Sequence, residues 1–198
     1  MMKMVISFML IVLFSCGVEM ETVSEITVND APEFFKLADS SAIVLVQTLG
    51  GRLTEVFQTD GVIKAIDVCK KEAYEITGNL EDEISGNISI KRVSNKYRNP
   101  QNAPDKHEKE ALKWFETQLF EKNTLPKLYG QKILRKNNEF LRYYKPMRVQ
   151  TKCLLCHGDE ETRLPEVSSR INKFYPEDMA VDYKDGDFRG LIRVETQI

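Results

Sequence analysis

The stretch FRGLIRVE, residues 188–195, decides the fold class because it carries the cleanest strand pattern in the chain. Two sets of side chains alternate along it, with Phe188, Gly190, Ile192 and Val194 on one side and Arg189, Leu191, Arg193 and Glu195 on the other. A period of two residues predicts a strand with two different faces. Ile88, Ile90 and Val93 predict a second strand, and residues 139–144, limited by Pro146, predict a third.

Helical patterns occupy much of the chain before these strands. A first helix is expected to begin near Asp30, a suitable N-cap, with Pro32 in its first turn. It either stops at Gly50-Gly51 or continues to Phe57. Thr59-Asp60-Gly61 is then expected to break the chain.

A second helix is expected after this break, because apolar residues recur at intervals of four, three, four and three. These residues are Val62, Ile66, Cys69, Ala73 and Ile76, so Cys69 is placed on the buried face. Asp105 and Glu108 have the spacing of a capping box and predict a third helix. Helices followed by strands interleaved with helices indicate an α+β domain with an antiparallel sheet.

Length and composition indicate one globular domain. The chain has 198 residues, of which 42% are hydrophobic and 29% charged, which is enough apolar material for a core. The formal net charge of -2 argues against a nucleic-acid binder, whose footprint would be a basic face. His107 and His157 are the only histidines, and the sequence has no distal histidine–arginine pair of the kind a peroxidase uses. We therefore expect no enzymatic activity.

The first sixteen residues, MMKMVISFMLIVLFSC, are typical of an export signal. An apolar run at 4–14 follows Lys3 and is too short to span a bilayer. The end of this stretch resembles a bacterial lipoprotein signal, which implies that Cys16 is lipidated. The alternative is an ordinary cleaved signal in which Cys16 plays no part.

The expected organisation is a signal peptide at 1–15, a lipidated tether at 16–30 and one domain at 31–198. The polar composition of residues 17–30 suits a tether. The domain is then expected to be exported and anchored to the membrane, facing the periplasm. Both c-type haem and disulfides persist in that compartment.

The motif Cys153-Leu154-Leu155-Cys156-His157 carries the chemistry. In an exported protein, C-x-x-C-H is typical of c-type haem attachment, in which each thiol adds to one haem vinyl group and the histidine reaches the iron. Two alternatives stay open. One is a zinc site formed by Cys153, Cys156, His157 and Cys69. The other is a redox disulfide between Cys153 and Cys156, although the βαβ context of a thioredoxin-type site is missing.

Several stretches beyond this motif resemble a known family. It is the single-haem c-type domain with a PAS-like fold that occurs in small exported bacterial proteins and in sensor regions of signalling proteins. In chain order the stretches are AIDVC (65–69), RVSNKYRNPQNAPD (92–105), RYYKP (142–146), CLLCHG (153–158), YP (175–176) and GDFRG (186–190). Residues 119–138 depart from the family by being longer and more polar.

The resemblance implies an α+β fold with a PAS-like antiparallel sheet and N-terminal helices packed around one covalently bound haem c. It implies that Cys153 and Cys156 form thioethers to the haem. It also implies that His157 is one axial ligand of the iron and that Cys69 is the other.

Other residues compete for the second axial position. Without the resemblance, Cys69 is best interpreted as a small buried hydrophobe. Met147 is an alternative ligand, because methionine–histidine ligation is common in electron-carrier cytochromes, although it could simply fill the core. His107 falls among charged residues and is expected on the surface. Arg98 and Arg142 could pair with haem propionates, because guanidinium suits carboxylates.

These residues favour a lipid-anchored haem protein that senses redox state or a small gas. Ferric iron stabilises a bound thiolate, and reduction would weaken the bond, so that Cys69 leaves and opens a site for a gas. The alternatives are a periplasmic electron-transfer cytochrome, whose ligands stay in place, and a non-haem domain with structural zinc. We expect any signal to pass to an unidentified protein partner.

Overall fold

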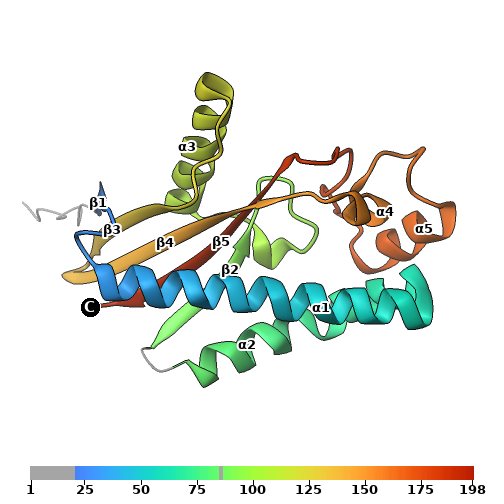
Figure 1. The fold of residues 1–198 in the computed structure, drawn as a ribbon, viewed down its shortest axis with the longest axis horizontal. Coiled ribbons are helices and arrows are strands. Elements are labelled where there is room, and N and C mark those ends of the chain that lie inside the picture. The colour runs from blue at the N-terminus through green and yellow to red at the C-terminus, as the bar shows by residue number, and fades with distance from the viewer. Residues whose placement is uncertain (1–20, 85–86) are drawn as a thin grey trace, which may run out of the picture.

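The computed structural model describes residues 21–84 and 87–198, which form an α+β fold around one five-stranded antiparallel sheet (Figure 1). The strands are β1 (Thr22–Glu25), β2 (Ile88–Val93), β3 (Tyr129–Arg135), β4 (Asn138–Arg148) and β5 (Phe188–Gln197), in the order β1-β3-β4-β5-β2. The helices are α1 (Pro32–Lys71), α2 (Ala73–Glu83), α3 (Lys106–Lys122), α4 (Leu154–His157) and α5 (Pro165–Phe174), with 3-10 turns η1 (Pro100–Asn102) and η2 (Thr151–Cys153). The α+β prediction is confirmed, while the predicted signal peptide and Cys16 lie outside the described residues. None of the described helices has both the length and the apolar character needed to cross a membrane.

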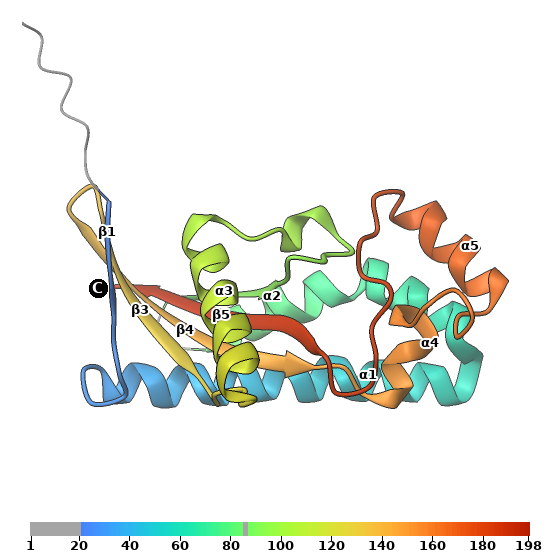
Figure 2. The same cartoon turned by 90° about the horizontal axis from the view of Figure 1, so that it is seen from above.

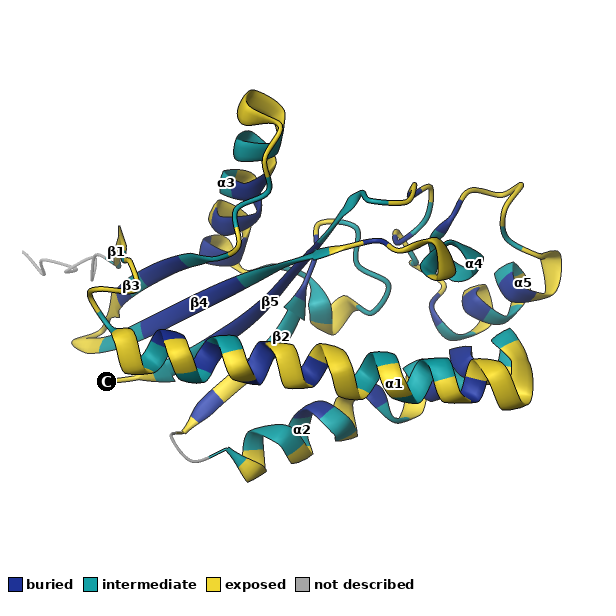
Figure 3. Cartoon of the chain, in the orientation of Figure 1, coloured by how far each residue is buried: buried dark blue, intermediate teal, exposed yellow. Residues whose placement is uncertain are grey.

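The sheet is covered on both faces, which the alternation in residues 188–195 does not predict. Ile192 and Val194 lie in a core cluster with α1, whereas Leu191 lies in a second cluster with α3. The central parts of β4 and β5 are therefore buried, whereas their ends are not (Figure 3). Arg193, which the alternation places on the same side as Arg189 and Glu195, is only 7% exposed because α3 lies over it.

The third predicted strand is longer than expected, because Pro146 does not end it. β4 continues to Arg148, although β3 pairs with it only as far as Tyr129 opposite Tyr144. Beyond that pair β4 has a free edge, where a sheet tolerates a residue without a backbone N–H. The sequence predicts no strand at β3, since the buried Gln131 interrupts the apolar pattern.

The chain before α1 contains an edge strand where the sequence predicts a tether. β1 pairs with β3, with Val23 opposite Ile133. All four side chains of β1 are exposed, so its composition resembles that of a linker. Asp30 is not the N-cap of α1, because its carboxylate accepts hydrogen bonds from the amide and hydroxyl of Thr27 at 2.7 and 2.8 Å. Ala31 is the N-cap instead.

Helix α1 turns back on itself at Gly61, whose φ of +84° and ψ of 175° only glycine adopts easily. Figure 2 shows the chain returning after this turn. The first arm, residues 32–60, packs against the second arm, residues 62–71, through Leu53, Val56, Ala65 and Val68. The predicted break at Thr59-Asp60-Gly61 is thus confirmed, whereas Gly50-Gly51 stays helical.

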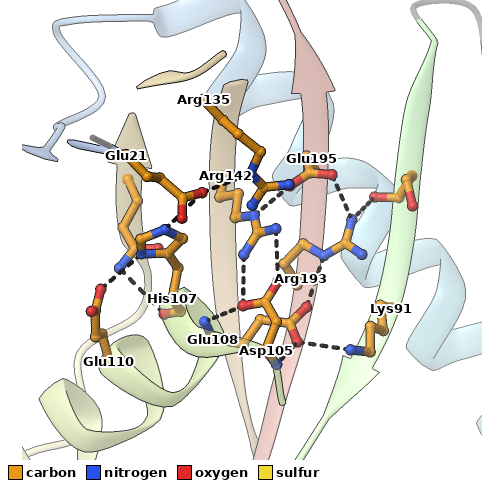
Figure 4. Close-up of polar contacts among 12 residues, drawn as sticks. Glu21, Lys91, Asp105, His107, Glu108, Glu110, Arg135, Arg142, Arg193 and Glu195 are labelled. Atoms are coloured by element: carbon orange, nitrogen blue, oxygen red, sulfur yellow. Dashed lines mark hydrogen bonds and ion pairs between the residues drawn. The ribbon is translucent and has the colours of Figure 1, made fainter. Parts of the chain in front are cut away.

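The start of α3 is fixed on the sheet by a buried carboxylate (Figure 4). The predicted capping box is present, since Glu108 and Asp105 accept hydrogen bonds from each other's backbone amides, both at 2.8 Å. Glu108 is 1% exposed and also accepts hydrogen bonds from Lys91 at 2.7 Å and Arg193 at 3.3 Å. Burying a carboxylate costs free energy unless it is paired with a cation. Lys91 and Arg193 therefore stabilise the observed position of α3 on the sheet.

Replacing Gly61 by alanine is expected to lower the free energy of unfolding by about 1–3 kcal/mol, because a Cβ is strained at this backbone conformation. No atom would lie within 4 Å of the added Cβ, so strain and not a clash is tested. Gly51→Ala is the matched control, since Gly51 is helical with equally open surroundings. Alanine there should raise the free energy of unfolding by about 0.5–1 kcal/mol. Urea titrations measure the free energy of unfolding of both variants. If the two substitutions change it in the same direction, the strained backbone conformation at Gly61 is contradicted.

Candidate functional site

The C-x-x-C-H motif lies just beyond β4, where the chain leaves the sheet. Its cysteines bracket one continuous helical stretch, since Cys153 ends η2 and Cys156 lies in α4. Figure 1 places α4 and α5 together at the end of the sheet, above the turn of α1. The second arm of α1 packs against α5 through Ile66, Val167 and Ile171.

The two thiols of the motif contact different apolar clusters. Cys156 packs against the cluster of α1 and α5 that includes Tyr175, and Cys153 packs against Val149, Ala180 and Tyr183. Both are free thiols in this structure. Burial raises the pKa of Cys156 to about 11, so the neutral thiol is favoured at neutral pH.

His157 is held in one tautomer by the loop that precedes β5. Its Nδ1 lies 2.7 Å from the carbonyl of Ala180, and because a carbonyl can only accept, Nδ1 is the donor. The backbone of His157 is held as well, since its carbonyl accepts from Tyr183 N–H at 3.0 Å. The ring of Tyr183 meets the imidazole edge-on at 6.3 Å between centroids. Nε2 therefore keeps its lone pair, as in a histidine that ligates a metal.

The charge state of His157 suits the same role. Burial, with the positive charges of Arg98 and Arg189 nearby, holds the pKa of this imidazole well below its ordinary value. The ring is therefore neutral at physiological pH. A neutral imidazole is the form that binds metal ions.

Cys69 lies on the second arm of α1, the arm that packs against α5. It is a half-buried free thiol, and a negative charge on it would raise the pKa values of Cys156 and Tyr175. Burial raises the pKa of Cys69 itself, while Arg92 and Arg98 oppose that shift.

Three cations line the motif. Arg98 pairs with the nearly buried Asp178 at 3.1 Å. Arg189 and Lys96 donate hydrogen bonds to carbonyl and hydroxyl oxygens, and both stand over the ring of Tyr183, at 5.1 and 4.4 Å from its centroid. Within the described residues, Arg189 and Lys96 form no ion pair with a carboxylate.

One buried donor of this site has no acceptor. Nε of Arg98 is buried and makes no hydrogen bond within the described residues. An unpaired buried donor costs about 1–3 kcal/mol, so its position favours a ligand that brings an acceptor. The two propionates of haem would supply both the acceptor and the negative charge, so the residues present fit that group.

Arg142 does not lie at this site, and the prediction that it meets a haem propionate is wrong. Its guanidinium is buried between β4 and the start of α3, where it pairs with Asp105 at 2.9 Å and with Glu195 (Figure 4). These carboxylates already occupy its donors. The sequence alone does not indicate that its neighbours on the sheet are acidic.

His107 and Met147 also lie elsewhere. His107 is 1% exposed and not on the surface as predicted, because its ring nitrogens lie 2.9 Å from Glu110 and 3.1 Å from Glu21 (Figure 4). Met147 packs against the core cluster between the sheet and α1, in agreement with core filling. Neither residue is among those that surround His157.

The structure adds residues to the site that spacing does not predict. Arg92, Lys96, Asp178, Tyr183 and Arg189 converge on it from the C-terminal end of β2 and the residues after it, from the loop before β5 and from β5 itself. Three of them fall within stretches that resemble the family, but no pattern in the sequence indicates that they meet. In the described ranges, no three Cys, His, Asp or Glu side chains gather closely enough to hold an ion, so the zinc alternative finds no support.

Comparisons with known proteins agree with this architecture. A family model described as Tll0287-like matches residues 18–196. A solved structure described as the crystal structure of the cyanobacterial heme-protein Tll0287 is 21% identical, with a TM-score of 0.53, and the match covers 85% of this chain and 95% of that one. This likeness shows the fold, and no curated protein matches the chain. The family match spans nearly the whole sequence, so the chain belongs to the Tll0287-like family.

Proposed function

We propose that this chain binds one haem c, with Cys153 and Cys156 as thioether donors and His157 as an axial ligand. The observation that carries the proposal is the bond from His157 Nδ1 to Ala180, which leaves Nε2 free on the same helical stretch as the two thiols. The buried Nε of Arg98, which lacks an acceptor among the described residues, supports it. A protein of the same fold is described as a heme-protein. Haem would supply a one-electron couple and an iron that binds small gases.

The test is covalent haem attachment in a host that matures c-type cytochromes. We expect the full-length chain to show a Soret band and to retain haem after denaturation. The Cys153→Ala, Cys156→Ala double variant should lose the covalent haem, because both thioethers are gone. Cys69→Ala is the matched control and should keep it. A wild-type protein without a Soret band would contradict the proposal, and metal analysis would then test for zinc.

We propose Cys69 as the second axial ligand, and exchange of this ligand as the basis of a redox or gas sensor, not of an enzyme. The support is the electrostatic coupling between Cys156 and Cys69 on the second arm of α1, while Met147 packs against the core between the sheet and α1. A thiolate is bound more weakly by ferrous than by ferric iron, because the iron loses a charge. Cys69 would then leave on reduction and free a position for a gas. A periplasmic electron carrier is the alternative.

Cys69→Ala is expected to remove a thiolate charge-transfer band from the ferric spectrum, while Met147→Leu leaves the spectrum unchanged. In the wild type, reductant followed by carbon monoxide should give a shifted Soret band within seconds. A ferrous protein that keeps its sixth ligand and excludes carbon monoxide would be an electron carrier. Loss of a methionine band in Met147→Leu would reassign the ligand.

We also propose that Cys16 is lipidated and anchors the domain to a membrane, facing the periplasm. The support is the lipoprotein-like signal in the sequence. Wild-type chain should partition into the detergent phase of a membrane extract, because an acyl chain adds about 0.8 kcal/mol per buried CH₂. Cys16→Ser should shift the chain to the aqueous phase. If both partition alike, Cys16 is not the anchor.

A further inference from the structure

Arg98 joins the two halves of the proposed haem site through a single guanidinium nitrogen. Its Nη2 lies 2.6 Å from the carbonyl of Cys156, 3.1 Å from a carboxylate oxygen of Asp178 and 3.3 Å from the carbonyl of Ala180. The first acceptor belongs to the C-x-x-C-H helix. The other two belong to the loop that orients His157, so Arg98 ties that loop to the helix.

The acceptors of Arg98 are themselves linked to His157. Asp178 uses its other carboxylate oxygen to accept from the backbone amide of Ala180 at 2.9 Å. The carbonyl of Ala180 accepts from His157 Nδ1 at 2.7 Å. Ala180, whose carbonyl accepts the hydrogen bond from the histidine, is thus held at its amide by Asp178 and at its carbonyl by Arg98. Asp178 and Arg98 are 4% and 12% exposed in their side chains, so water competes little for these bonds.

We infer that Arg98 is a positioning residue that fixes the Ala180 carbonyl on His157 and thereby sets the electron donation of the axial imidazole. The inference rests on the proposed function and deepens it. A hydrogen bond from Nδ1 to a fixed carbonyl raises the basicity of a ligating histidine. Without Arg98 the loop loses its attachment to the C-x-x-C-H helix, and the bond from His157 lengthens or breaks.

Arg98 could affect the iron in two ways, by positioning the Ala180 carbonyl or simply by its positive charge. Two substitutions distinguish these effects. Arg98→Lys keeps the positive charge, but its ammonium ends one bond short of Nη2 and cannot reach the same three acceptors. Arg163→Gln removes a charge that acts on His157 without touching the bonds at Ala180, since Arg163 donates to the carbonyl of Asp159 at 3.3 Å. Asp178→Asn tests the other contact that holds Ala180, namely the hydrogen bond from its backbone amide to Asp178.

The first measurement needs no haem. The chain has two histidines, so the ¹⁵N shifts of His157 can be assigned once those of His107 are removed in a His107→Gln background. We expect the Nδ1–H tautomer to dominate in the wild type and in Arg163→Gln. In Arg98→Lys and Asp178→Asn the share of the Nε2–H tautomer should rise, because the acceptor for Nδ1 is no longer fixed.

The second measurement is the midpoint potential of the haem-loaded protein. Weaker donation by His157 destabilises ferric iron, so Arg98→Lys should raise the potential. The expected change is on the order of tenfold in the oxidised to reduced ratio, or about 59 mV for one electron. Arg163→Gln should lower the potential, because it removes a positive charge and leaves the bonds intact.

The inference about Arg98 and the proposed haem function are contradicted by different results. If Arg98→Lys keeps the wild-type tautomer and potential, and Asp178→Asn keeps the wild-type tautomer, Arg98 acts only through its charge and the inference is wrong. A shifted potential in Asp178→Asn alone would reflect the negative charge that this substitution removes. If no haem attaches even to the wild type, the proposed function is wrong. The tautomers in the haem-free protein then still decide whether Arg98 positions His157.

Discussion

The reversal of the chain at Gly61 is the constraint on which the rest of the site depends. A helix that continued straight would carry Cys69 away from the motif. The turn instead returns α1 along itself, and Cys69 follows about two helical turns later. Arg52 and Glu72 pair across the two arms at 2.9 Å, and Asp67 accepts two hydrogen bonds from Arg170 of α5 at 2.8 and 2.6 Å. The backbone of one glycine therefore determines that the arm carrying Cys69 returns to pack against α5.

The buried arginines of this chain divide into two groups according to their partners. Arg142 and Arg193 lie under α3 with Asp105, Glu108 and Glu195, so their charges are neutralised within the protein. Breaking such a pair leaves an unpaired buried charge, which makes these residues part of the fold. Arg98, by contrast, pairs with Asp178 but keeps a buried Nε without an acceptor among the described residues, and Arg189 forms no ion pair with a carboxylate there. A buried donor that the chain does not satisfy favours an added acceptor, and this distinction separates Arg98 from Arg142.

Local signals in the sequence are sufficient for the elements and the motif, but not for long-range contacts. The strand at 188–195, the break at Gly61 and the capping box of α3 depend on neighbouring residues, and each is found as predicted. β1 and the burial of His107 depend on partners far along the chain, such as β3 for the strand and Glu21 for the histidine. Arg98 and Arg142 are equivalent in composition and spacing. Only the fold reveals that Arg142 contacts Asp105, whereas Arg98 contacts the carbonyl of Cys156.

The two proposed axial ligands are held by different elements, which favours a ligand-exchange switch over an electron carrier. His157 is fixed by its own helix, by Ala180 and by Tyr183, whereas Cys69 belongs to a separate helical arm. An electron carrier works best when both ligands are held by one rigid frame, because small rearrangement keeps electron transfer fast. Here a change at Cys69 would act on the second arm of α1, which packs against α5 and, across the turn at Gly61, against the first arm. A ligand exchange would therefore have a packed contact through which to move the first arm, which is what a sensor requires.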